Sequence, residues 1–232
     1  MEGREHMPHQ EALPLSIRDQ GSFDTFIKGA CSSLIDTLVK SAQGGEHEFF
    51  FVSGPRGCGK SHLLSAVSHE FDGAFCVDLE LARAFSPEFI DISQPKIALI
   101  DNADAIAGNV EWELALFSLF NRWYDSKEGT LVISSTPSFD RIPFERHDLN
   151  TRLSSGICIN LKPLNEQECI EALILRAKSR GFTLPDSAAL FLVRHCNRDM
   201  NKLIAELDIL DNAQLEEKRS ITVPFIKKVF DL

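Results

Sequence analysis

Residues 54–61 read Gly54-Pro55-Arg56-Gly57-Cys58-Gly59-Lys60-Ser61. This is a complete G-x-x-x-x-G-K-[ST] pattern, a loop in which glycines let successive backbone N–H groups turn toward one anion. An apolar, strand-like run precedes it at residues 48–53, and residues 62–67 can continue it as a helix. A strand, this loop and a helix, in that order, are typical of a phosphate-binding loop. The stretch therefore predicts a nucleotide site within an α/β fold.

The spacing of the motif gives its residues different roles. Lys60 is expected to reach the outer phosphates, and the Ser61 hydroxyl is expected to ligate magnesium. The candidate nucleotide-binding positions of this segment are Pro55, Arg56, Gly57, Cys58, Gly59, Lys60, Ser61 and His62.

A carboxylate that could share the magnesium ion follows the next strongly apolar run. Residues 96–100 are strand-like and end in Asp101, which is where a second metal ligand of such a site is expected. The alternative is an exposed carboxylate that starts a turn. Related ATPases often carry an adjacent acid that polarises the attacking water, but here the next residue is Asn102 and the next acid is Asp104. We therefore predict slow intrinsic hydrolysis.

Three further features have both a functional and an ordinary interpretation. Ser134, Ser135 and Thr136 end another strand-like run and either sense a γ-phosphate or form a simple strand-to-turn transition. Arg152 precedes the last predicted strand, where it either points at a neighbouring subunit's nucleotide or lies on the surface. Arg198 starts a helix late in the chain and either closes onto the phosphates or is solvated.

Composition narrows the classes of function. The 232-residue chain has a formal net charge of −10, which does not suit a duplex DNA binder, so we expect protein partners and no direct sequence-specific DNA binding. Its cysteines are scattered without a C-x-x-C pair, which indicates reduced thiols in a cytoplasmic protein. No apolar run is long enough to span a membrane.

The order of periodic segments predicts the fold class. Five short apolar runs alternate with helical sequence, which favours a five-stranded parallel sheet flanked by helices, and the sequence after residue 162 is helical only. In the helix expected at residues 112–124, a buried stripe is predicted at Leu114, Leu116, Phe117, Leu119 and Phe120. We expect a flexible leader at residues 1–20, a nucleotide-binding α/β domain at 21–162 and a small helical domain at 163–232.

Together these motifs resemble those of AAA+ ATPases across residues 23–232. The residues that carry the resemblance are the loop at 54–61, the run 97–101 ending in Asp101, the run 131–136, Leu149-Asn150-Thr151-Arg152-Leu153 and Arg198-Asp199-Met200. Within that class, residues 23–29 and 59–64 look like the replication initiator DnaA. DnaA carries a basic helix-turn-helix domain after its helical lid, and we expect none here.

What remains resembles the Hda family of DnaA-related regulators. In that family a peptide of the form Q-x-x-L-P-L docks on the β subunit of the DNA polymerase III sliding clamp. Gln10, Leu13, Pro14 and Leu15 fit this form, although Glu11 stands where an aliphatic residue is more usual. The resemblance implies a cytoplasmic protein that associates with the nucleoid through the clamp.

The resemblance also implies roles around the nucleotide. Arg152 would be an arginine finger that completes the ATP site of DnaA in trans, so that hydrolysis leaves inactive DnaA. The protein's own nucleotide would be a structural ligand, ADP or another nucleoside diphosphate, or ATP, bound with Mg²⁺. Arg198 would be the lid arginine on that nucleotide, and Phe26 and Ile27 would lie near its base. Intrinsic ATPase activity would be weak at most.

Two other functions stay open at this point. One is a self-sufficient ATPase or helicase loader resembling DnaC, which the acidic charge disfavours because handling DNA calls for basic surface. The other is a nucleotide-binding module without a clamp contact. A homodimer that hides Arg152 is also compatible with the sequence.

Overall fold

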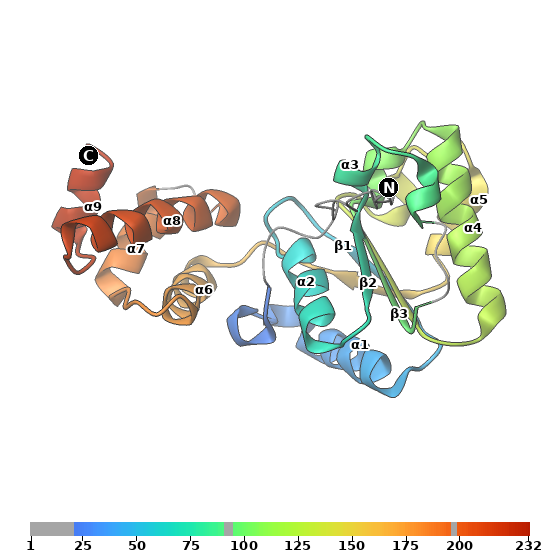
Figure 1. The fold of residues 1–232 in the computed structure, drawn as a ribbon, viewed down its shortest axis with the longest axis horizontal. Helices are drawn as coiled ribbons and strands as arrows, with labels where there is room; N and C mark the ends of the chain where they lie inside the picture. The colour runs from blue at the N-terminus through green and yellow to red at the C-terminus, as the bar shows by residue number, and fades with distance from the viewer. Residues whose placement is uncertain (1–20, 91–94, 196–198) are drawn as a thin grey trace, which may run out of the picture.

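The computed structural model describes residues 21–90, 95–195 and 199–232. Five strands form one parallel sheet in the order β2-β3-β4-β1-β5 (Figure 1). Their bounds are β1 Phe49–Ser53, β2 Phe75–Asp78, β3 Ile97–Asp101, β4 Thr130–Ser135 and β5 Ile157–Asn160. The expected five-stranded parallel sheet is confirmed.

Alternating side chains of the strands build a core on each face of the sheet. In β1, Phe49 and Phe51 pack on one face, whereas Phe50 and Val52 pack on the other. Both faces are buried, so β1, β3 and β4 read as nearly continuous apolar runs, as expected for a parallel sheet covered by helices.

Helices cover the two faces, as Figure 1 shows. The core on one face includes residues of α1 and α2, and the core on the other includes residues of α3, α4 and α5. Their bounds are α1 Ser32–Gly44, α2 Lys60–Glu70, α3 Leu79–Ala82, α4 Val110–Ser126 and α5 His147–Leu153. Short 3-10 turns at η1 Phe23–Thr25, η2 Gly29–Cys31, η3 Pro87–Ile90, η4 Ala103–Ile106 and η5 Phe139–Arg141 join these elements.

The helices after the last strand form a bundle with a core of its own. They are α6 Glu166–Ser179, α7 Asp186–His195, α8 Met200–Glu217 and α9 Val223–Val229. Leu173, Leu192, Leu203 and Leu207 are among the buried residues of this core. In Figure 1 the bundle lies to one side of the sheet, beyond α2.

Side-chain caps set where several of these helices begin. At α6, Asn165 Oδ1 accepts from the backbone N–H of Glu168 at 3.0 Å, and Glu168 Oε2 accepts from the N–H of Asn165 at 2.8 Å. This reciprocal capping box satisfies two N–H groups that the helix itself cannot. It fixes the start of the bundle only a few residues after β5.

Two residues of the stripe predicted for α4 differ from the prediction, because Leu114 is exposed and Phe117 is only partly buried. Leu114 is 49% exposed, because the buried stripe of α4 runs instead through Trp112, Leu116, Leu119 and Phe120, at helical spacing from one another. The prediction that Leu114 is buried was therefore wrong.

Candidate nucleotide site

The phosphate-binding motif forms the loop between β1 and α2, at the floor of a cleft of about 370 Å³. Residues 56–61 of the motif and the adjoining His62 line this cleft. Gly57 and Gly59 have φ values of 77° and 99°, in the left-handed region that glycine adopts without strain. The loop can fold back on itself only because these positions lack a side chain.

Lys60 begins α2 and is almost fully buried, with 6% of its surface exposed. Its ammonium group donates to the carbonyl oxygens of Gly54 at 2.8 Å and Pro55 at 3.2 Å, within its own loop. Pro55 thus contributes a carbonyl oxygen and does not line the cleft. A buried ammonium held by carbonyls at the loop is placed to turn toward an anion that enters the cleft.

Asp101 ends β3 and is fully buried. Its Oδ1 accepts from the Ser134 hydroxyl and, at 3.1 Å, from the backbone N–H of Asn102, whereas its buried Oδ2 has no hydrogen-bond partner. Burial raises the pKa of this carboxyl, and the charge of Asp78 adds to the rise. The nearby hydroxyls of Ser134 and Ser61 and the charge of Lys60 oppose it. A buried carboxylate oxygen without a partner fits a cation ligand.

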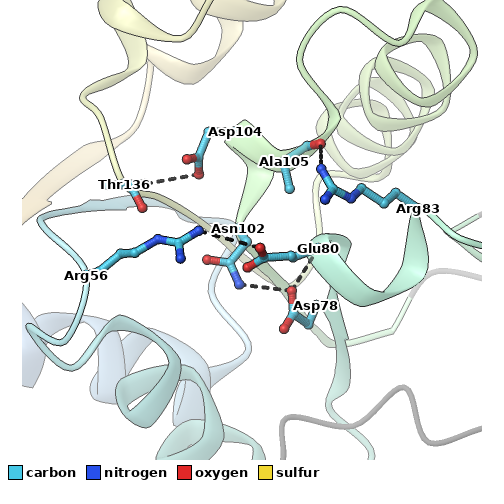
Figure 2. Close-up of polar contacts among 8 residues, drawn as sticks. All are labelled: Arg56, Asp78, Glu80, Arg83, Asn102, Asp104, Ala105 and Thr136. Atoms are coloured by element: carbon cyan, nitrogen blue, oxygen red, sulfur yellow. Dashed lines mark hydrogen bonds and ion pairs between the residues drawn. The ribbon is translucent and has the colours of Figure 1, made fainter. Parts of the chain in front are cut away.

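A polar wall faces the loop across the cleft (Figure 2). Asn102 Nδ2 donates to Asp78 Oδ1 at 2.9 Å, and both residues line the cleft. Glu80 also lines it, and its carboxylate lies 3.5 Å from the guanidinium of Arg56. Acidic and basic groups therefore meet at the phosphate end of the cleft.

The three polar residues at the end of β4 separate into different environments. Thr136 lines the cleft, and its backbone N–H donates to Asp104 Oδ1 at 3.0 Å. Ser135 is fully buried and its hydroxyl donates to the Pro137 carbonyl, so it faces away from the cleft. Ser134 binds Asp101 instead. Of the three candidate γ-phosphate sensors, only Thr136 reaches the cleft.

Aromatic and apolar residues close the other end. Phe26 and Ile27 line the cleft together with Thr25 and His62. The rings of Phe26 and His62 meet edge to face, with centroids 5.3 Å apart, and the Thr25 hydroxyl lies 3.2 Å from His62 Nε2. Aromatic and apolar groups that line the cleft suit the base and sugar of a nucleotide.

The helical bundle supplies one side of the cleft. Four of its residues line it together with Leu164, which precedes α6: Ala172, Met200, Asn201 and Ile204. The start of α8 comes close to the loop, since a Cβ at Gly57 would lie 3.6 Å from both Asp199 Oδ1 and Asn201 Nδ2. The expected lid residue Arg198 lies outside the described residues.

Arg152 lies on α5, away from the cleft of its own chain. Its guanidinium lies over rings of α4, 5.6 Å from the centroid of Tyr124 and 5.9 Å from those of Phe117 and Phe120. Among the described residues, the contacts of the Arg152 guanidinium are those with these three rings. The charge is therefore held against an aromatic face and remains available to an anion.

Comparisons with known proteins agree with this architecture. Residues 166–230 match the family model described as Hda, lid domain. An uncharacterised protein of Haemophilus influenzae is 36% identical over 231 residues, which cover 97% of this chain and 100% of that protein.

Solved structures share the fold. Domain III of the replication initiation protein DnaA from Thermotoga maritima superposes with a TM-score of 0.75 at 18% identity, over 90% of this chain and 95% of that one. AMPPCP-bound DnaA from Aquifex aeolicus gives 0.68 at 16% identity, over 84% and 66% of the two chains.

The chain is Hda-like: residues 166–230 belong to the Hda lid domain family, and most of the chain shares the AAA+ fold of DnaA domain III. The predicted fold class and the predicted relationship are both confirmed. Among the described residues of this Hda-like protein, no helix is both long and apolar enough to cross a membrane. The same residues contain no cluster of three or more His, Cys, Asp or Glu placed to hold a metal ion by themselves.

Sequence reasoning missed several residues of the cleft in this Hda-like protein. Asp78 and Glu80 come from the end of β2 and the start of α3, and the bundle contributes Met200 and Asn201. The carboxylates could have been suspected from their place after an apolar run. The bundle residues carry no such signal, because only the packing of the bundle brings them to the loop.

Proposed function

We propose that this protein switches off the replication initiator by supplying Arg152 to the ATP site of DnaA. The Hda lid match and the AAA+ fold support a DnaA-related replication regulator. One observation carries the finer proposal: Arg152 lies outside its own cleft, with its guanidinium held only by the rings of α4 among the described residues. An arginine supplied in trans is worth about 10³-fold or more in nucleotide hydrolysis.

The cleft of the protein itself would hold ADP, another nucleoside diphosphate or ATP as a structural ligand. The fit rests on the phosphate-binding loop, on buried Lys60 and on the unpaired Oδ2 of Asp101. Ser61 and Asp101 would hold Mg²⁺, which would neutralise charge on the phosphates when bound. Phe26 and Ile27 would contact the base, and the start of α8 would close over the loop.

Docking on the DNA-loaded sliding clamp completes the proposal. The peptide Gln10, Leu13, Pro14 and Leu15 would bind the clamp, but it lies outside the described residues and rests on its sequence alone. Such docking would place Arg152 near DnaA on newly replicated DNA. A homodimer that covers the α5 face would then be an inactive form.

The test measures hydrolysis of DnaA-bound ATP in the presence of clamp loaded on DNA. Wild-type protein should accelerate hydrolysis, and Arg152→Ala should abolish the acceleration while keeping nucleotide binding and stability. Arg141→Ala removes an exposed arginine from the preceding turn and is the matched control. Deletion of residues 1–15 should abolish both clamp retention and acceleration.

Two outcomes would redirect the proposal. Acceleration that survives Arg152→Ala would exclude the trans-arginine role. No acceleration by wild-type protein, together with rapid ATP turnover by the protein alone, would favour a loader or self-sufficient ATPase.

A further inference from the structure

We propose that Asp78 is the water-activating carboxylate of this cleft and that Asn102, hydrogen bonded to it across the ends of neighbouring strands, restrains it. The inference rests on the proposal above that the cleft binds a nucleotide. It assigns the slow hydrolysis predicted from the sequence to a different cause, the restraint of Asp78. Asp78 does bring a further carboxylate to the cleft, but one of its oxygens is hydrogen bonded to Asn102.

The sheet brings Asp78 beside the predicted metal ligand. Asp78 and Asp101 are register partners at the carboxyl ends of β2 and β3, which are adjacent parallel strands. Partners in register project to the same face, so the two carboxylates lie near each other at one edge of the sheet. Asp78 lines the cleft, whereas Asp101 lies fully buried beneath it.

The other carboxylates of this region are less suited to contact water at the phosphates. Asp104 accepts the backbone N–H of Thr136 at 3.0 Å and does not line the cleft. Glu80 faces Arg56 at 3.5 Å (Figure 2). Of these carboxylates, Asp78 is the one that accepts a hydrogen bond from the side chain of Asn102, the residue after Asp101.

Two donors converge on the same oxygen of Asp78. Its Oδ1 accepts from Asn102 Nδ2 at 2.9 Å and from the backbone N–H of Glu80 at 2.9 Å. Each donor occupies a lone pair of this oxygen, and together they hold the carboxylate turned toward Asn102 and the start of α3. The amide of Asn102 cannot accept a proton itself, so it restrains Asp78 without replacing it.

Asn102 is fixed in the position that aims its amide at Asp78. Its φ of 56° lies in the left-handed region, which asparagine tolerates better than most side chains. Its backbone N–H donates to the Ser134 hydroxyl at 3.2 Å and to Asp101 Oδ1 at 3.1 Å. An acid at this position would instead place two carboxylates within hydrogen-bond distance of each other, which is unfavourable unless one holds a proton.

Released from Asn102, Asp78 would act on a bound nucleoside triphosphate in one balanced step. A water oxygen forms a bond to the γ-phosphorus while its proton passes to the Asp78 carboxylate. The bond between the γ-phosphorus and the β,γ-bridging oxygen breaks, and its electron pair leaves with the nucleoside diphosphate. A positioned general base of this kind contributes about 10²- to 10⁴-fold.

The first test is single-turnover ATP hydrolysis by the full chain alone, without DnaA or clamp. Asn102→Gly removes the amide at a φ that glycine accepts, and should raise the rate about tenfold or more. Asp78→Asn keeps the shape of the side chain but cannot take the proton. The double variant Asp78→Asn with Asn102→Gly should therefore return to the wild-type rate.

The matched control removes a hydrogen bond to η4, the turn that follows Asn102, through a residue that lies outside the cleft. Arg83 donates to the carbonyl of Ala105 at 3.0 Å and does not line the cleft (Figure 2). Arg83→Ala should leave hydrolysis unchanged. Equilibrium nucleotide binding, measured for every variant, separates this inference from the proposed function: loss of binding in wild type would refute the nucleotide site, not the pairing of Asp78 with Asn102.

A second readout needs no nucleotide. In ¹⁵N-labelled protein, the side-chain amide signals of Asn102 should shift in Asp78→Asn, since the acceptor loses its charge, and stay in place in Arg83→Ala. Unchanged signals would refute the interaction. With binding intact, an Asn102→Gly variant no faster than wild type, or a double variant as fast as Asn102→Gly, would overturn the role of Asp78.

Discussion

The carboxylate of Glu113, buried inside the protein, accepts the backbone N–H of Arg146 at 2.9 Å. Its other oxygen accepts the N–H groups of Gly108 at 2.8 Å and Glu145 at 3.1 Å. One side chain of α4 thus satisfies three backbone donors, two of them directly before α5. Since Arg152 is on α5, Glu113 positions the proposed finger without touching it.

Glu113→Gln should lower stability and weaken the action on DnaA. The amide keeps one acceptor oxygen but turns its NH₂ toward a backbone N–H, which leaves that donor unpaired. We expect a loss of about 2 kcal/mol in the free energy of unfolding, measured by urea titration. Stimulation of DnaA-bound ATP hydrolysis should fall as well, because α5 loses its anchor.

The control for this prediction lies on the same helical turn. Glu111 is exposed, so Glu111→Gln should change the free energy of unfolding by no more than about 0.5 kcal/mol. The stimulated rate of hydrolysis of DnaA-bound ATP should change by no more than the equivalent factor. Full stimulation by Glu113→Gln at unchanged stability would mean that this carboxylate does not position α5.

Asp101→Asn should stabilise the nucleotide-free protein near neutral pH. The folded-state pKa of Asp101 is raised above the ordinary value of 3.8, mainly by burial, so ionisation of this group costs stability as the pH rises through the folded-state pKa. Below pH 3.8 the carboxyl is protonated in both states, and the gain from asparagine should vanish. Urea titrations at pH 7.5 and pH 3.5, in the presence of a chelator, measure the difference.

The same variant should respond less to magnesium and nucleotide. The unpaired Oδ2 is lost as an anionic ligand, so the increase in melting temperature on adding Mg²⁺ with ADP should shrink in Asp101→Asn. An undiminished increase would show that Asp101 does not hold the cation.

The sequence was sufficient to predict those parts of the fold that follow from a local pattern of residues. Each strand is a short apolar run, and the phosphate-binding loop has a fixed spacing, so both could be recognised without knowing their neighbours. The seven-residue α5, His147–Leu153, was not predicted, because it is short and its surroundings carry few apolar residues. Its position depends on Glu113, an acid that sequence reasoning would place at the surface.

The site was less predictable because it is assembled from distant segments. Asp78 meets Asn102 only because β2 pairs with β3 as the edge strand of the sheet, an arrangement that no local pattern encodes. In the same way, Ser135 and Thr136 are neighbours in sequence, yet only Thr136 reaches the cleft. Ser135 is the last residue of β4 and its hydroxyl turns to the Pro137 carbonyl, whereas Thr136 begins the turn after the strand, and the sequence alone did not establish which of them faces the cleft.

Cys76 should be nearly inert to alkylation while the protein is folded. Burial, together with the charges of Asp101 and Asp78, raises the pKa of its thiol to about 12. At pH 8 the reactive thiolate is then only about 10⁻⁴ of the total, against roughly a quarter for an ordinary thiol. Peptide mass spectrometry after iodoacetamide treatment should show slow labelling that becomes rapid in urea, and rapid labelling of folded protein would contradict this environment.

Arg56→Ala should weaken nucleotide binding without affecting stability. The Arg56 guanidinium is paired with Glu80 at 3.5 Å, and the two side chains are 79% and 45% exposed, so the pair itself contributes about 0.5 kcal/mol or less. In the cleft, however, the same guanidinium can turn to a phosphate, where a charge-assisted hydrogen bond is worth about 1.5–3 kcal/mol, or roughly tenfold or more in affinity. Glu80→Gln is the matched variant, because it removes the competing carboxylate and should tighten binding slightly. Equilibrium titration with a fluorescent nucleotide, beside a thermal melt, measures both quantities. Loss of stability with unchanged affinity in Arg56→Ala would instead assign Arg56 to the structure of the loop.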